Sequence, residues 1–251
     1  MSIKSVQRAM NILELIQKEG PGLSLGEISK SLDLPKSTAH GIIKTLQSQD
    51  FIKQHARTSE YHLGIKLFEL GNTLADSMDI VNLGHQYLEY LVEEYNETAH
   101  LAILSDKEVV YVDKKEGEGA LRMYSQLGKR APLYCTGVGK AMLAHLPEKD
   151  IDKILSEMEM TAFTPNTITD SEQLKEHLEE TKTQGYLYDD EEIEIGLKSV
   201  AAPVFNHKSE VFAAISCAGP SSRFGDERIK EIGLTLKSYA EQISKSFGYT
   251  K

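Results

Sequence analysis

The sequence predicts an α+β protein with a winged helix-turn-helix domain over residues 1–64, a linker helix over 65–78, and a domain of mixed helices and strands over 79–251. Three observations support this prediction. A helical hairpin near the N-terminus is followed by two short alternating strands. An excess of positive charge is confined to the same segment. Farther along the chain, strand-like and helix-like segments are mixed, which is typical of a sheet flanked by helices.

The first element is an amphipathic helix. Ser5 is its expected N-cap, and the helix should end before Gly20-Pro21-Gly22, a combination that stops helices. Its apolar positions are Val6, Ala9, Leu13 and Ile16.

The stretch from Ser24 to Leu46 then predicts two short helices hinged at residues 33–35. Ser24 and Glu27 form the S-x-x-E capping box that satisfies backbone donors in a first helical turn. Pro35 suits the first position of the second helix, because its φ is already helical and its missing N–H would be unpaired there. Apolar residues recur at helical spacing in both helices, at Leu25, Ile28, Leu32, Ala39, Ile42, Ile43 and Leu46.

The second helix of the hairpin has a polar outer face, formed by Ser37, His40, Gly41, Lys44 and Ser48. This face contains hydroxyls, an imidazole and an amine but no carboxylate, so it can enter a DNA major groove without repelling phosphate. Helical hairpins with polar faces also occur in proteins that never bind nucleic acid. The face alone therefore leaves both interpretations open.

The two strands after the hairpin favour DNA binding. Residues 51–55 and 61–63 alternate apolar and polar side chains across a polar turn, as the two strands of a wing do. The tip of a wing, here Arg57 and Thr58, typically lies over phosphate or a minor groove. The residues expected to contact DNA are Lys36, Ser37, Thr38, His40, Gly41, Lys44, Thr45, Arg57 and Thr58.

The net charge of −10 is unevenly distributed along the chain. Residues 1–63 contain 8 Lys and Arg against 6 Asp and Glu, a balance of +2, which leaves 20 against 32 and a balance of −12 for the remainder. A surplus of +2 would bind DNA weakly in one copy, so we expect a dimer that presents two such domains to a double-stranded operator. The acidic remainder should lie away from the phosphates.

The remaining elements follow from local pattern. The proline-free segment 65–77, with Ile65 and Phe68, predicts a helix at which two chains meet. Further helices are expected over 79–95, 137–145, 149–158, 171–184 and 226–247. Strands are expected over 100–104, 109–112, 120–126, 198–205 and 211–217.

The bulk properties exclude several classes of protein. No apolar run approaches the ~18 residues of a membrane helix, and the N-terminus lacks the apolar segment of a secretory signal. The two cysteines, Cys135 and Cys217, are far apart and do not suggest a disulfide framework. We therefore expect a cytoplasmic protein without membrane attachment.

The chain resembles the IclR family of bacterial transcriptional regulators over essentially its full length. The motifs that carry this resemblance are SVQRAMNIL, GLSLGEISK, LPKSTAH, YHLG, GKRAPLYCTGVGKA, GYLYDDEE, SVAAPVF and AAISCAGP. The resemblance implies a GAF-like effector-binding domain at the C-terminus and dimers that pair into tetramers. It also implies a transcriptional regulator, expected to be a repressor, controlled by a small effector such as an organic acid or a sugar acid.

One position departs from the family pattern. Where Gly41 stands, family members commonly have a basic residue that reaches DNA. Glycine loses that contact and costs about 1 kcal/mol of helix propensity. It also permits the helix backbone to approach the groove closely, so base preferences cannot be transferred from relatives.

The segment Thr136-Gly137-Val138-Gly139-Lys140 is not a phosphate-binding P-loop, because Tyr134 and Ala141 replace required residues. Thr136 can nevertheless cap the helix that follows. The small residues then expose the first N–H groups of that helix, a favourable place for a carboxylate. The alternative is an ordinary glycine-containing helix start.

By resemblance, Asp189 points into the effector pocket and accepts a hydroxyl group of the ligand, while residues 190–192 remain a solvated acidic run. Ser199 and Ser216 supply hydroxyls, Met123 and Leu197 form apolar walls, and Ala131 leaves room for a larger ligand. Family members often have cysteine in place of Ser199 and serine in place of Ala218, which should alter ligand choice. The expected effector-binding residues are Met123, Ala131, Gly137, Val138, Asp189, Leu197, Ser199, Ser216 and Ala218.

Two other functions remain open. Cys135 precedes a helix start and could be the nucleophile of an enzyme if His100, His145 or His207 reached it, although a small buried residue is the simpler interpretation. The winged helix could instead bind RNA or another protein. Zinc could be held by Cys135, Cys217 and a histidine, although these residues lack the short paired spacings of a metal site. We predict no enzyme activity, no cofactor and no metal.

Overall fold

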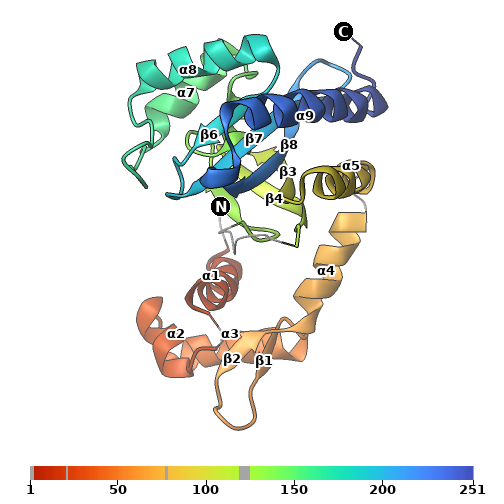
Figure 1. The fold of residues 1–251 in the computed structure, drawn as a ribbon. Coiled ribbons are helices and arrows are strands. Elements are labelled where there is room, and N and C mark those ends of the chain that lie inside the picture. Colours follow the sequence, from red (N-terminus) through yellow and green to blue (C-terminus); the bar gives the residue numbers. More distant parts are fainter. Residues whose placement is uncertain (1–2, 21, 77–78, 119–124, 251) are drawn as a thin grey trace. The chain divides into compact units, whose positions relative to one another are not determined.

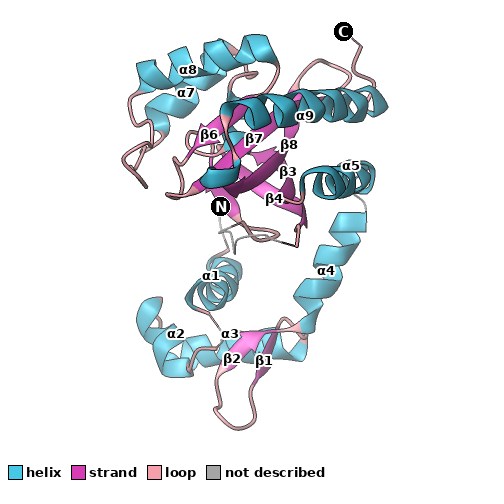
Figure 2. Ribbon diagram, viewed as in Figure 1, coloured by secondary structure: helices cyan, strands magenta, loops and turns pink. Residues whose placement is uncertain are grey.

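The computed structural model describes residues 3–20, 22–76, 79–118 and 125–250. The chain divides into two compact units, Met1–Ser77 and Met78–Lys251 (Figures 1 and 2). Within the described residues, the helices are too short or too polar to cross a membrane.

The first unit is a winged helix-turn-helix domain followed by a helix. Its elements are α1 (Lys4–Glu19), α2 (Leu25–Ser31), α3 (Lys36–Ser48), β1 (Ile52–Gln54), β2 (Tyr61–Leu63) and α4 (Ile65–Asp76). The apolar faces of α1, α2, α3, β1 and β2 meet in one core, formed by Ile12, Ile16, Ile28, Ile43, Ile52 and Tyr61. The strands β1 and β2 pair antiparallel, and Leu23 extends the pairing by bridging to Tyr61.

The capping box that begins α2 is confirmed. The Ser24 side chain accepts a hydrogen bond from the Glu27 N–H, and Glu27 accepts one from the Ser24 N–H at 2.8 Å. Two predicted helix starts were wrong by a residue or two. Helix α1 begins at Lys4 with Ile3 as N-cap rather than Ser5, and Pro35 is the N-cap of α3 rather than its first residue, because its ψ of 136° is extended.

The predicted apolar stripe of α1 also needs correction. Val6 is 47% exposed, whereas Ile12, which was not assigned to the stripe, is completely buried beside Ile16. In α4, Ile65, Phe68 and Leu74 are exposed, so they are available for contact with another chain.

The second unit is a six-stranded antiparallel sheet between two helical layers. Its elements are α5 (Asp79–Tyr95), β3 (Thr98–Ser105), β4 (Glu108–Lys115), β5 (Arg130–Pro132), α6 (Gly137–Leu143), α7 (Glu148–Glu157), α8 (Ser171–Gln184), β6 (Leu187–Asp190), β7 (Leu197–Phe205), β8 (Val211–Pro220), a 3₁₀ turn (Ser221–Arg223) and α9 (Asp226–Ser246). The strand order is β5-β4-β3-β8-β7-β6. Helices α5 and α9 pack on one face, and α6, α7 and α8 pack on the other (Figure 2).

The sequence missed two short strands. Strand β5 has three residues, too few for an alternating pattern. Strand β6 ends in the first two residues of an acidic run, which is a pattern typical of a loop. Strand β6 does alternate, because Leu187 and Asp189 are buried while Tyr188 is exposed. The strand predicted over 120–126 lies largely outside the described residues, and residues 125 and 126 are not in a strand.

Thr98 offers a test of the packing of β3. Its hydroxyl is fully buried and has no hydrogen-bond partner in the described part of the chain. Burying an unpaired hydroxyl costs about 1–3 kcal/mol, so Thr98→Val should raise the free energy of unfolding by about 1 kcal/mol and Tm by about 2–4 °C. Calorimetry of the effector-free protein measures this change.

The matched control is Thr167→Val. The Thr167 hydroxyl donates to the Glu192 carbonyl at 2.6 Å and accepts from the N–H groups of Phe163 and Thr164. This variant should lower the free energy of unfolding, because it leaves buried groups unpaired. A Thr98→Val variant that loses stability as Thr167→Val does would contradict the prediction.

Candidate functional site

The outer face of α3 is open to solvent. Its exposed residues include Ser37, His40, Gly41 and Lys44, while Thr38 is half-buried. A Cβ atom at Gly41 would meet no other atom within 4 Å. No packing inside the domain therefore requires glycine at this position.

The wing turn carries the second group of predicted DNA contacts. The turn is closed by a hydrogen bond from the Ser59 N–H to the His55 carbonyl at 2.9 Å, and the Thr58 N–H donates to His55 Nδ1. Arg57, at the tip, is exposed. Lys36, Lys44 and Arg57 form no ion pair with any described residue.

A cavity in the second unit is lined by residues predicted for effector binding. About 490 Å³ of atom-free space, which includes open solvent at the mouth, lies among the residues that line it. Eight of the nine predicted residues line it: Ala131, Gly137, Val138, Asp189, Leu197, Ser199, Ser216 and Ala218. Met123 lies outside the described residues.

The register of the sheet brings these residues together. Asp189, Ser199 and Ala218 are direct neighbours across β6, β7 and β8, and Ser216 pairs with His100 across β8 and β3. Because side chains alternate between the faces of a sheet, Ser216 and Ala218 point to the same side. The sheet therefore forms one wall of the cavity.

Helix α6 forms a second wall, and glycine permits its close approach. A Cβ atom on Gly137 would lie 2.5 Å from Ser199 Oγ. The predicted cap is present, because Thr136 Oγ1 accepts a hydrogen bond from the Gly139 N–H at 3.2 Å. The N–H groups of Gly137 and Val138 belong to the first helical turn, where no intrahelical acceptor exists.

The sequence missed five cavity residues, namely His100, Tyr111, Ser125, Thr136 and Ile193. His100 is central among them, with Nε2 at 2.7 Å from Ser125 Oγ and Nδ1 at 3.4 Å from Ser216 Oγ. Burial, together with the charge of Lys114, lowers the pKa of His100 to about 3, so the imidazole is neutral. The one available signal was a histidine within an otherwise apolar strand.

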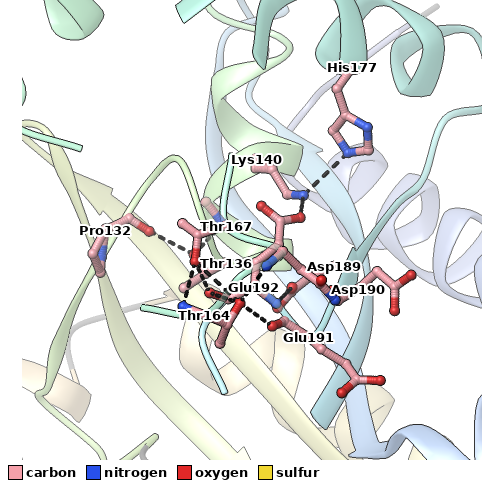
Figure 3. Close-up of polar contacts among 12 residues, drawn as sticks. Pro132, Thr136, Lys140, Thr164, Thr167, His177, Asp189, Asp190, Glu191 and Glu192 are labelled. Atoms are coloured by element: carbon pink, nitrogen blue, oxygen red, sulfur yellow. Dashed lines mark hydrogen bonds and ion pairs between the residues drawn. The ribbon is translucent and has the colours of Figure 1, made fainter. Parts of the chain in front are cut away.

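Asp189 is the acidic group of the cavity. It is 2% exposed, and burial raises the pKa of its carboxyl group to about 7, against the opposing effect of Lys140. Its Oδ1 accepts a hydrogen bond from the Glu192 N–H at 2.9 Å. Figure 3 shows this carboxylate beside the turn that follows β6.

The prediction that residues 190–192 form a solvated run was wrong for Glu192. Its carboxylate is buried and pairs with Lys140, whose side chain is completely buried on α6. Asp190 and Glu191 are partly exposed, and Asp190 pairs with Lys198 at 2.8 Å. The acidic run gave no sign that Glu192 is buried, because Lys140, the residue that pairs with it, lies 52 residues away in the chain.

The structure disfavours Cys135 as a nucleophile. The side chain is completely buried, and burial, together with the nearby Asp189, raises the pKa of its thiol to about 12. The reactive thiolate is therefore a very minor form at neutral pH. The described residues also contain no group of three or more His, Cys, Asp or Glu side chains placed to hold a metal ion.

Comparison with known proteins agrees with this architecture. The model of the IclR helix-turn-helix domain matches residues 5–56, and that of the bacterial transcriptional regulator IclR C-terminal domain matches residues 72–245. The chain is 38% identical to the HTH-type transcriptional regulator XynR of Escherichia coli, with 98% of each chain covered. It is 34% identical to the transcriptional repressor IclR of the same organism, with 98% of this chain and 90% of the relative covered.

A solved structure extends the agreement to three dimensions. The Thermotoga maritima IclR crystal structure is 35% identical and superposes with a TM-score of 0.82 over 99% of this chain and all of that one. The predicted fold class, a winged helix-turn-helix domain with a GAF-like effector-binding domain, is confirmed. The chain belongs to the IclR family of bacterial transcriptional regulators, which combine a DNA-binding domain with a domain that binds a small-molecule effector.

Proposed function

We propose that this regulator is a repressor whose affinity for its operator is controlled by a small organic acid or sugar acid bound in the cavity of the second unit. The observation that carries the proposal is the convergence of Asp189, Ser199 and Ser216 on one cavity from three different strands. The relatedness to the E. coli repressor IclR supports repression rather than activation.

The polar groups of the cavity suit such a ligand. Asp189 can accept hydrogen bonds from ligand hydroxyl groups, and Ser199 and Ser216 can donate or accept them. A ligand carboxylate would be favoured near the first N–H groups of α6. The neutral His100 adds a further hydrogen-bonding group without adding charge.

On the DNA side, we propose that α3 enters the major groove and the wing tip lies over the backbone. The contacts would come from Lys36, Ser37, Thr38, His40, Gly41, Lys44, Thr45, Arg57 and Thr58. Two chains would pair through exposed apolar residues such as Phe68 on α4 and could form a dimer of dimers. The operator would then be roughly palindromic.

The proposed switch is a shift of population between two forms. The effector would draw the turn near Asp189 onto the cavity, and α4 near Phe68 would reset the spacing of the two DNA-binding domains. We place the protein in the cytoplasm, where both the operator and the metabolite are present.

Asp189→Asn tests the proposal. A thermal-shift panel of small acids, including lactate, gluconate and 4-hydroxybenzoate, first identifies a compound that stabilises the wild-type protein. That compound should release wild-type protein from promoter DNA. The variant should need about 10- to 100-fold more of it, because one hydrogen bond to a charged group contributes about 1.5–3 kcal/mol. Fluorescence anisotropy measures the release.

Asp190→Asn is the matched control, because this neighbouring acid is partly exposed and pairs with Lys198 rather than lining the cavity. It should release DNA at the wild-type concentration. Equal release of wild type and Asp189→Asn would refute the proposed role of Asp189. Steady turnover of the compound, abolished by Cys135→Ala, would instead support an enzyme, and binding of RNA or protein without binding of promoter DNA would support an adaptor.

A further inference from the structure

A buried ion pair lies directly behind the effector cavity. Lys140 has no exposed surface and Glu192 almost none, and their charged ends contact each other across α6 and the turn after β6. Lys140 stands one helical turn after Gly137, which lines the cavity. Removing two charges from water is costly, and an apolar pair of similar volume is often as stable. The stability of the fold therefore does not by itself explain why a charged pair is buried at this place.

The contacts of Glu192 indicate another purpose. Its backbone N–H donates to Asp189 Oδ1 at 2.9 Å, while its carboxylate contacts Lys140. Figure 3 shows these contacts converging on the turn after β6. Lys140 Nζ also lies 3.2 Å from His177 Nε2 on α8. Glu192 thus links Asp189 to Lys140 on α6, and Lys140 in turn contacts His177 on α8.

The same turn is held from its other side by two threonines. Thr164 Oγ1 donates to the Glu191 carbonyl at 2.7 Å, and Thr167 Oγ1 donates to the Glu192 carbonyl at 2.6 Å. Among the described residues, the second carboxylate oxygen of Asp189, Oδ2, makes no hydrogen bond. That oxygen is therefore available to a ligand while Oδ1 is engaged.

We propose that Lys140 and Glu192 are positioning residues for the effector cavity: their ion pair holds the turn after β6, so that Asp189 binds the backbone through one oxygen and presents the other to the ligand. This inference rests on the proposed role of the cavity. It adds to that role by assigning the orientation of Asp189 to two residues that do not line the cavity.

The charges of the pair also act on Asp189. Burial raises the pKa of Asp189. The charge of Lys140 on α6 and the hydrogen bond from the Glu192 N–H lower it, whereas the charges of Glu192 and Asp190 raise it. Two further groups are affected by the charge of Asp189. Burial raises the pKa values of Tyr111 on β4 and of Cys135 before α6, and the charge of Asp189 raises them further. On α8, burial and Lys140 lower the pKa of His177 to about 4, so that residue is neutral at pH 7. Removing the charge of Glu192 while keeping Lys140 should therefore lower the pKa of Asp189.

The test compares the full-length wild type with Glu192→Gln, without any ligand. Carbon-13 NMR follows the carboxyl signal of Asp189 between pH 5 and 9. The pKa midpoint should fall by about one unit in the variant, because a nearby like charge is removed. Hydrogen exchange, followed by mass spectrometry, should accelerate by about tenfold in residues 188–196 and remain unchanged in residues 211–220.

Glu191→Gln is the matched control, because it removes the same charge one residue earlier, where the carboxylate is bound to the Gly196 N–H rather than to Lys140. It should retain the wild-type midpoint. Exchange of residues 188–196 at the wild-type rate in Glu192→Gln would overturn the proposal, and so would acceleration of exchange that is equal in the two segments. Both measurements are made without an effector, so their outcomes do not depend on the outcome of the Asp189→Asn release experiment.

If Glu192→Gln does not fold, the double variant Lys140→Met with Glu192→Leu provides a second test by hydrogen exchange. It removes both charges and leaves neither one uncompensated. Residues 211–220 should then keep their protection, while residues 188–196 exchange about tenfold faster. Wild-type protection of residues 188–196 in the double variant would overturn the proposal.

Discussion

Lys140→Met should destabilise the second unit by about 3–5 kcal/mol, because it leaves the carboxylate of Glu192 buried without its cation. The structure makes this loss severe. Glu192 Oε2 already has no hydrogen-bond partner in the described part of the chain, so the lysine is the main compensation for the charge. Urea unfolding, followed by the fluorescence of the tyrosines, measures the free energy of unfolding.

Adding Glu192→Leu to Lys140→Met should restore most of this stability, since the uncompensated charge is then removed as well. Lys175→Met is the matched control. Lys175 pairs with Asp152 at 2.8 Å on the surface, where ion pairs contribute about 0–1 kcal/mol. A double variant as unstable as the single one would show that packing of the lysine stem, rather than the unpaired carboxylate, accounts for the loss.

Lys44→Ala should weaken operator binding about 100-fold or more in the proposed dimer. Each chain loses one contact to phosphate, and a hydrogen bond to a charged group contributes about 1.5–3 kcal/mol. The slope of log affinity against log salt should become less steep by about one per lost contact, hence about two per dimer. Titration of a promoter fragment at several salt concentrations measures both quantities.

Lys18→Ala removes the same charge from the exposed last turn of α1, at a residue that is not among those expected to contact DNA. It should leave the salt slope near that of the wild type. The placement of α3 in the groove would be wrong if the two variants lost the same affinity and the same slope.

Local signals were sufficient for most of the DNA-binding unit. The capping box at Ser24 and Glu27 depends on residues three apart, and the spacing of Ala39 and Ile43 describes one helix face. The errors at Ser5 and Pro35 were also local, since each concerned which of several adjacent residues takes a non-helical ψ. The open surface at Gly41 required the fold, because a glycine in a sequence does not reveal whether packing demands it.

The cavity was predictable only in part. Asp189, Ser199 and Ala218 were named from resemblance to a family, and no periodicity in the chain indicates that they are neighbours. Their adjacency depends on the pairing of β6 with β7 and of β7 with β8. His100 was considered only as a partner for Cys135, whereas the structure places it between Ser125 and Ser216 in the cavity.

The sequence by itself determined the helices, the wing and the separation of a basic segment from an acidic one, because caps, apolar spacing and charge are properties of residues close together in the chain. The tertiary structure alone decided that Glu192 is buried, that Cys135 stays protonated, and that His100 joins the cavity. Each of these depends on which distant residues exclude water from a side chain and on which charges face it. Strand register and burial arise only when the whole sheet is assembled.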